Sequence, residues 1–206
     1  IPAAVAIPKT VEDLQRLIQL AHQTGVGLIP RTAGTSLAGQ VVGPGIIVDV
    51  SRHFTRIIEI NPAEKWVRVQ PGVVRDELNL VLSEQGLMFG PETSTSNRAM
   101  IGGMVGNNSC GSNSIVYGST REQTIEIQGL LSDGSLARLG PISVEPLRQL
   151  AETEPSTMAD RIIRQTYRLL KDPSTQQEIF RQFPKPSIRR RNTGYALDRL
   201  IECDAF

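Results

Sequence analysis

The spacing of apolar and polar residues predicts alternating strands and helices over the first 90 residues. Short apolar runs at 3–8, 26–30 and 45–51 are typical of strands, and we expect the first of them to be buried. Apolar residues recur at helical spacing over 9–25. The order of these segments predicts a β-α-β unit.

Local signals mark the ends of the predicted helix at 9–25. Thr10 can cap its start, and Asp13 stands three residues later, in a capping-box position. Gly25 fits the C-terminal stop. The loop after the strand at 26–30 therefore lies at a strand end, where open α/β sheets place their ligands.

Further along, the pattern changes twice. Residues 55–72 predict two strands joined by a turn at Asn61-Pro62, and residues 73–87 predict an amphipathic helix ended by Gly86. Gly, Ser, Thr and Asn then dominate residues 90–119, and an irregular segment of that length is unusual inside a compact domain unless it is functional.

The last third of the chain predicts a hairpin followed by helices. An Asp-Gly pair between two apolar runs is a strong hairpin signal. The predicted elements are a hairpin over 122–139 that turns at Asp133-Gly134, two or three helices over 143–183 with breaks near Pro155 and Pro173, and a basic loop over 185–198 that leads into a last helix.

Composition and charge exclude several classes of protein. The chain has 206 residues, 39% of them hydrophobic, and a formal net charge of +1, so no overall field favours nucleic acid or an anionic membrane. Two cysteines make no disulfide framework, which predicts a reducing, cytoplasmic setting, with peripheral contact at the inner face of a membrane left open. The chain starts without Met and stops within an amphipathic run, so we interpret it as part of a longer protein.

The segment "PRTAGTSLAGQ" (30–40) is a candidate anion-binding loop. Gly34 and Gly39 have the spacing of a P-loop, but Gln40 and Val41 replace its Lys and Ser/Thr, so nucleoside triphosphate chemistry is poorly supported. Small residues still allow backbone N–H groups to approach a phosphate or pyrophosphate. The alternative is a plain glycine-rich turn.

A second loop, "IGGMVGNNSCG" (101–111), also offers small residues together with amide and hydroxyl groups, but it lacks the dinucleotide-binding fingerprint G-x-G-x-x-G. Its apolar residues favour an ordered loop over a flexible surface one. Cys110 is either a redox or covalent thiol or, as we expect, a small buried residue. His22 and His53 have no partners at ligand spacing, so we predict no metal site. The run Arg189–Arg191 is either a solvated loop or a contact to an anion.

Four separated motifs now support a resemblance. The segments "PRTAGTSLAGQ", "VQPGVV", "GPETSTSNRAMIGGMVGNNSCGSNSIVYGSTREQTIEIQGLLSDG" and "NTGYALD" resemble the FAD-binding domain of the vanillyl-alcohol oxidase / p-cresol methylhydroxylase superfamily. The likeness is strongest to the branch of the glycolate oxidase flavin subunit, D-lactate dehydrogenases and D-2-hydroxyglutarate dehydrogenase.

The resemblance implies an α+β fold, a two-lobed FAD-binding domain of the p-cresol methylhydroxylase type. Its first lobe would span 1–90 and its second 91–186, with 187–206 starting the connection to a substrate domain outside this chain. The implied cofactor-binding residues are Thr32, Ala33, Gly34, Thr35, Ser36, Gly39, Gln40, Pro91, Glu92, Ser94, Ile101, Gly102, Gly103, Asn107, Asn108, Ser109, Gly111, Tyr117, Gly118 and Ile127. Since residues 31–36 hold no His, we expect the FAD to be non-covalent.

The activity that the resemblance implies is oxidation of a small D-2-hydroxy acid, glycolate- or D-lactate-like, to the 2-oxo acid, with the hydride passing to the flavin N5. We find no catalytic residue of such an enzyme in this chain, and expect them in the substrate domain. The resemblance also implies an iron–sulfur electron acceptor, as a domain or subunit; two cysteines cannot supply its cluster here. Two alternatives stay open: an FAD reductase of the UDP-N-acetylenolpyruvoylglucosamine type, and a non-catalytic nucleotide-binding module.

Overall fold

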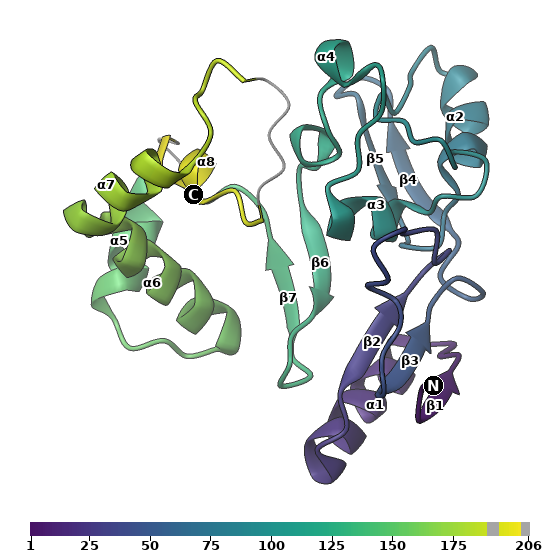
Figure 1. Cartoon of the computed structure of the whole chain (residues 1–206), viewed down its shortest axis with the longest axis horizontal. Coiled ribbons are helices and arrows are strands. Elements are labelled where there is room, and N and C mark those ends of the chain that lie inside the picture. The colour runs from purple at the N-terminus through teal and green to yellow at the C-terminus, as the bar shows by residue number, and fades with distance from the viewer. Residues whose placement is uncertain (189–193, 203–206) are drawn as a thin grey trace. The chain divides into compact units, whose positions relative to one another are not determined.

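The computed structural model describes residues 1–188 and 194–202. Its contacts divide the chain into two compact units, Ile1–Thr124 and a second that starts at Ile125, and each is described by itself. Both units mix helices and strands, which confirms the α+β class (Figure 1). The lobe boundaries at residues 90 and 186 rest on the family resemblance and stay predictions.

The first unit opens with the predicted β-α-β unit. Thr10 and Asp13 form the capping box of α1, and Gly25 ends it with φ +69°. Strand β3 lies between β1 and β2 and is parallel to both, so the order is β1-β3-β2 (Figure 1). The bounds are β1 Ala4–Ala6, α1 Val11–Thr24, β2 Leu28–Arg31 and β3 Ile46–Asp49.

One expectation about this sheet is wrong. Strand β1 exists, but Val5 is 58% exposed, because β1 is an edge strand and pairs on one side only. The buried strand is β3, where Ile46, Ile47 and Val48 have neighbours on both sides. An apolar run therefore marked the strand correctly but not its place in the sheet.

A hydrophobic core joins the rest of the first unit. Val73, Leu78 and Leu82 form its buried centre, and residues of β4, β5 and Ile101 pack against them. Strands β4 and β5 are antiparallel, as the pattern predicted. The bounds are β4 Ile57–Asn61, β5 Trp66–Val69, α2 Arg75–Ser83, α3 Ile101–Asn107, α4 Ser114–Tyr117 and a 3-10 turn at Arg121–Gln123.

The glycine-rich segment contains more regular structure than the sequence predicts. Helix α3 was expected as a loop, because three glycines in seven residues disfavour a helix. Tertiary packing overrides this preference: Met104 is 2% exposed, and the N–H of Ile101 donates to the carbonyl of Val73 at 2.9 Å. Helix α2 ends at Ser83, three residues before Gly86, whose φ of +67° makes the turn that follows.

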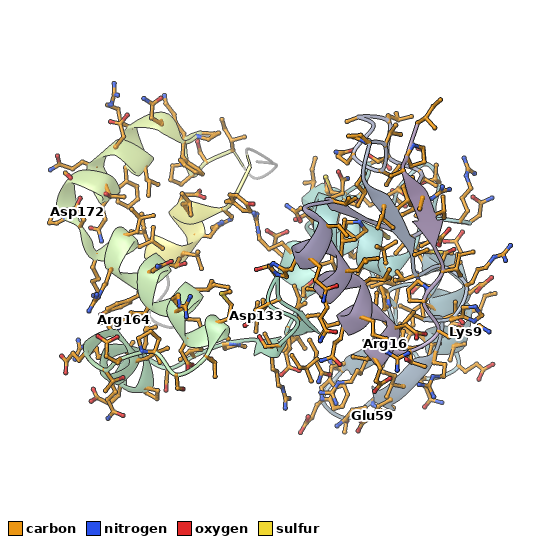
Figure 2. All side chains as sticks on the ribbon, turned by 90° about the horizontal axis from the view of Figure 1, so that it is seen from below. Lys9, Arg16, Glu59, Asp133, Arg164 and Asp172 are labelled. Atoms are coloured by element: carbon orange, nitrogen blue, oxygen red, sulfur yellow. The ribbon has the colours of Figure 1, made fainter. Side chains whose placement is uncertain are left out.

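The second unit contains the predicted hairpin and, among its described residues, four helices. Strands β6 and β7 are antiparallel, and the turn between them contains Asp133 (Figure 2). Pro173 does not merely interrupt the helices: it is the first residue of α7, capped by Asp172. The bounds are β6 Ile127–Leu130, β7 Leu136–Leu139, α5 Val144–Glu152, α6 Met158–Lys171, α7 Pro173–Gln182 and α8 Leu197–Glu202.

Two sequence interpretations concern other parts of the chain. Arg189–Arg191 lie outside the described residues, as do the first two residues of "NTGYALD". Within the described ranges, no helix is both long enough and apolar enough to cross a membrane.

Candidate cofactor site

The site begins at the carboxyl ends of β2 and β3. The two strands are parallel, with Arg31 opposite Asp49, so the loop that leaves β2 starts at this edge of the sheet. Gly34 and Gly39 adopt φ of +70° and +75°, a region that glycine enters without steric cost. The Ser36 hydroxyl donates to the Gln40 side-chain carbonyl and closes the loop on itself.

The two glycine-rich segments meet in the first unit, although they are far apart in the sequence. A Cβ at Gly103 would lie 2.6 Å from the Thr32 Oγ1, and a Cβ at Gly102 would lie 2.4 Å from the Cβ of Pro71. The Gly102 N–H also donates to the Pro71 carbonyl at 2.9 Å. These glycines therefore let α3 pack directly against the first loop and against the turn before α2.

Helix α2 fixes the segment that starts at Gly90. Arg75 donates from Nε to the Pro91 carbonyl at 3.0 Å and from Nη2 to the Phe89 carbonyl at 3.3 Å. The Asn79 side-chain amide pairs with the backbone of Phe89: its Nδ2 donates to the Phe89 carbonyl at 3.1 Å, and its Oδ1 accepts the Phe89 N–H at 2.8 Å. Pro91 is fully buried. This segment thus has a fixed backbone, set by two side chains of one helix.

Glu92 connects this segment to the end of the second loop. Its Oε1 accepts the Ser112 hydroxyl at 2.6 Å and the Asn113 N–H at 3.2 Å, and these hydrogen bonds lower the pKa of the carboxyl. A Cβ at Gly111 would lie 2.6 Å from the Glu92 carbonyl oxygen, so the two backbones touch. The structure therefore brings Glu92 and Gly111 together. The Glu92 carboxylate positions the loop through its hydrogen bonds to Ser112 and Asn113.

Tyr117 adjoins the same segment. A Cβ at Gly90 would lie 2.7 Å from the Cβ of Tyr117. Gly118 follows with φ +75° and so permits the chain to leave α4. The predicted "YG" pair is thus placed beside the predicted "GP" segment.

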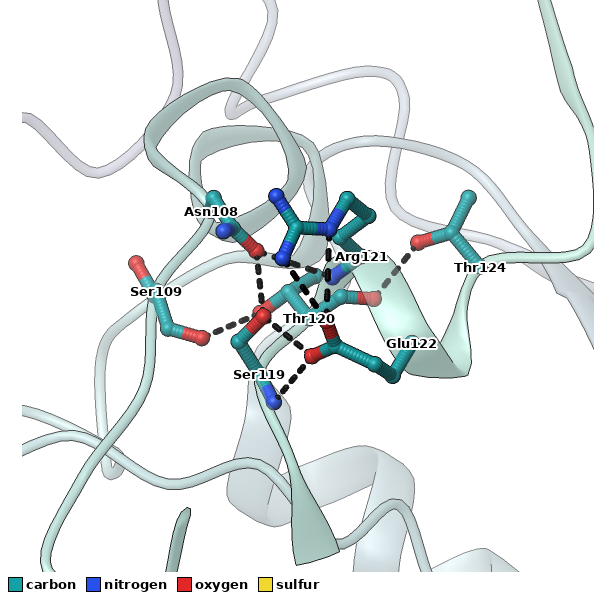
Figure 3. A network of polar contacts seen from close by, with 7 residues as sticks. All are labelled: Asn108, Ser109, Ser119, Thr120, Arg121, Glu122 and Thr124. Carbon is teal, nitrogen blue, oxygen red and sulfur yellow. Dashed lines mark hydrogen bonds and ion pairs between the residues drawn. The ribbon is translucent and has the colours of Figure 1, made fainter. Parts of the chain in front are cut away.

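Asn108 and Ser109, which directly follow α3, anchor the second loop. Asn108 ends the helix at φ +47°, and its Oδ1 accepts the Ser119 hydroxyl at 2.7 Å and the Arg121 N–H at 3.0 Å (Figure 3). The Ser109 carbonyl accepts both the N–H and the hydroxyl of Thr120, which is 1% exposed. These polar groups hold the loop in shape.

Glu122 completes this network with an unusual protonation equilibrium. Partial burial by itself would raise the pKa of Glu122. Hydrogen bonds from Ser119 and Arg121 outweigh that effect and lower the pKa to about 2. The carboxylate therefore stays ionised across the physiological range and keeps the turn after Gly118 in place.

The remaining predicted residues fall into three groups. Ala33 and Thr35 are half-buried in the first loop, and Ser94 is exposed. Asn107 donates to the Ser109 hydroxyl at 3.0 Å. Ile127 belongs to β6 in the second unit, so its place relative to the loops is not described.

Sequence reasoning missed two arginines. Arg75 positions the "GP" segment, and only the tertiary structure shows it. Arg31, the last residue of β2, was visible in the sequence directly before the first loop, and its Nε is buried without a hydrogen-bond partner. In the described part of the chain, no group of three His, Cys, Asp or Glu side chains is placed to hold a metal.

This arrangement is suited to binding an anionic ligand. Two uncharged loops meet at a sheet edge beside Arg31, whose Nε is buried, and their glycines permit close backbone approach. Those are the features of a domain that holds the anionic part of a nucleotide. The molecule is thus defined as a nucleotide-binding α+β domain.

Comparison with known families specifies the nucleotide. The profile of the family described as FAD binding domain matches residues 2–140. The chain belongs to this family, and its cofactor is FAD. The expected resemblance to the p-cresol methylhydroxylase type of flavoprotein is thereby confirmed.

Individual proteins that this chain resembles include two dehydrogenases and one oxidase of known structure. D-2-hydroxyglutarate dehydrogenase of Escherichia coli (strain K12) is 41% identical over 99% of this chain and 20% of that protein. Mitochondrial D-lactate dehydrogenase [cytochrome] of Kluyveromyces lactis is 32% identical over 66% of this chain and 24% of that protein. The structure of xylooligosaccharide oxidase from Myceliophthora thermophila, in complex with xylobiose, has a TM-score of 0.59 and 27% identity, and the match covers 68% of this chain and 29% of that one.

The extent of these matches differs in an informative way. The chain spans about a fifth of the length of the first curated relatives it matches. The D-2-hydroxyglutarate dehydrogenase match covers nearly the whole chain, whereas the family profile stops at residue 140. Helices α5, α6 and α7 therefore fall outside the general family match but inside the match to this relative.

Proposed function

We propose that this chain binds FAD non-covalently through the two loops that meet at Thr32 and Gly103. The observation that carries the proposal is the direct contact of these two loops. Residues of both loops belong to the cofactor-binding set that the family resemblance implies, and the contact joins segments that are far apart in the sequence. In this assignment the first loop and the "IGG" turn contact the dinucleotide. Glu92, Asn108 and Ser109 act mainly by holding the loops.

FAD, when bound, supplies the hydride acceptor for oxidation of a carbon–hydrogen bond. The chain's own residues contribute binding, orientation and a fixed backbone. Non-covalent attachment is favoured because residues 31–36 contain no His to form a tether. Cys110 lies in the second loop, half-buried, and our assignment gives it no covalent role.

The whole protein that carries this chain is, we infer, a dehydrogenase for a small D-2-hydroxy acid. The match to D-2-hydroxyglutarate dehydrogenase covers 99% of this chain, so a D-2-hydroxy dicarboxylate is the first substrate to test. D-lactate and glycolate are the next. The base and the residues that bind the substrate carboxylate would lie in a substrate domain outside residues 1–206. An iron–sulfur domain or subunit is the proposed electron acceptor, and the cytoplasmic setting stays a prediction.

Anaerobic reduction of the flavin tests this proposal. The whole protein is mixed with D-2-hydroxyglutarate, its L-enantiomer, D-lactate or NADPH, and the flavin absorbance is followed. We expect rapid bleaching by a D-hydroxy acid and none by the L-enantiomer or NADPH. Bleaching by NADPH alone would identify the reductase alternative. A bound nucleotide that no donor reduces would identify the non-catalytic module.

A further inference from the structure

The charge distribution of the two loops points to Arg31. Residues 32–48 and 99–120 contain no Asp, Glu, Lys, Arg or His, so both loops offer only neutral donors. A pyrophosphate carries negative charge that neutral donors solvate but do not balance. Arg31, the last residue of β2, is the cation placed directly before the first loop.

The structure holds the Arg31 guanidinium against Gly34. A Cβ at Gly34 would lie 2.8 Å from the Nε, 2.9 Å from the Nη2 and 3.0 Å from the Cζ of Arg31. The side chain therefore lies flat across the glycine that turns the loop at φ +70°. Only glycine leaves room for this arrangement, so the position of the Arg31 guanidinium depends on Gly34.

Among the residues that the structure describes, Arg31 has no counter-ion. Its Nε is buried without an acceptor, and the described residues give it no ion pair. Asp49, its neighbour in the sheet, instead accepts the Ser51 N–H at 2.9 Å. Leaving a buried charged donor unpaired is unfavourable, so an arginine in this position is suited to an anion that arrives from outside the chain.

We propose that Arg31 is a cofactor-positioning residue whose guanidinium balances the charge of the FAD pyrophosphate. The proposal rests on FAD as the cofactor and adds the residue that selects the phosphorylated forms of the flavin. Its chemistry differs from that of the loop backbone, because Arg31 contributes a full charge. Affinity that depends on Arg31 should therefore weaken as salt is raised.

The test compares ligands with and without phosphate. FAD is removed from the whole protein, and the affinities for FAD and riboflavin are measured by flavin fluorescence for the wild type, Arg31→Gln, Arg31→Lys and Arg16→Gln. Arg16 is an exposed residue of α1 and serves as the control for the same change of charge (Figure 2). Thermal unfolding of each apo protein reports on structure alone.

We expect Arg31→Gln to weaken FAD binding about 10- to 100-fold, the range for loss of a charge-assisted hydrogen bond. Riboflavin binding should stay unchanged, Arg31→Lys should recover part of the FAD affinity, and Arg16→Gln should match the wild type. Equal loss of FAD and riboflavin affinity, or apo unfolding that both Arg31 variants share, would assign Arg31 a structural role and overturn the proposal. A wild type that binds no FAD would instead refute the proposed function.

Discussion

Gly102 offers the sharpest test of how the loops are joined. A Cβ there would lie 2.4 Å from the Pro71 Cβ and 2.9 Å from the Pro71 Cα, about 1 Å short of a normal carbon contact of ~3.5 Å. Pro71 cannot move aside easily, because its ring is rigid and its carbonyl accepts the Gly102 N–H. Gly102→Ala should therefore separate α3 from the turn before α2.

Gly106→Ala is the matched control. Gly106 lies in the same helix, is exposed, and would have nothing within 4 Å of a new Cβ. Both substitutions gain the same helix preference of about 1 kcal/mol, so this contribution cancels between them. Overpacking costs about 1–3 kcal/mol, and Gly102→Ala should be less stable than Gly106→Ala by this amount.

Native-state hydrogen exchange measures this difference locally. Amides of residues 101–107 should exchange faster in Gly102→Ala than in Gly106→Ala, by a factor that corresponds to about 1–3 kcal/mol of opening free energy. FAD retention should fall in the first variant only. Equal exchange in the two variants would show that α3 does not need close contact with Pro71, contrary to this prediction.

Three further predictions concern the same unit. Gly34→Val should lower FAD affinity, because Gly34 has φ +70° and a side chain there would meet the Arg31 guanidinium. Cys110→Ser should leave the flavin content nearly unchanged. Full flavin content in Gly34→Val would contradict the assignment of the first loop to FAD. The pKa of Glu122 is lowered from 4.5 to about 2, so its contribution to stability is complete above pH 4.5 and is lost as the pH falls from there towards 2. Acid titration of unfolding should therefore be shallower in Glu122→Gln, and identical acid profiles would exclude this role. Thr10→Ala should cost about 1 kcal/mol through loss of the α1 cap, measured by hydrogen exchange in that helix, and no change would mean that the cap is dispensable.

The sequence predicted those features whose causes are local. The capping box of Thr10 and Asp13 and the stop at Gly25 depend on neighbours within a few residues, so they were readable in advance. Helix α3 was missed because its stability comes from Met104 and from hydrogen bonds to the turn before α2, which are tertiary. The exposure of Val5 was missed because strand order, not the apolar run, decides which strand is buried.

The candidate site shows the same division. The two loops were recognisable from their small residues, and the resemblance supplied their common ligand. Their meeting at Thr32 and Gly103, and the support of Pro91 by Arg75, are contacts between distant segments that no local pattern encodes. Arg31 was visible in the sequence, but only the structure shows that its Nε lacks a partner.

In the function that we propose, both loops of the first unit hold FAD together. Hydrogen exchange of the whole protein, measured with FAD removed and again after FAD is added back, tests this claim directly. We expect FAD to slow exchange in residues 31–40 and 101–111 at the same time, with little change in α1. Protection confined to one loop, or found only outside both, would contradict it.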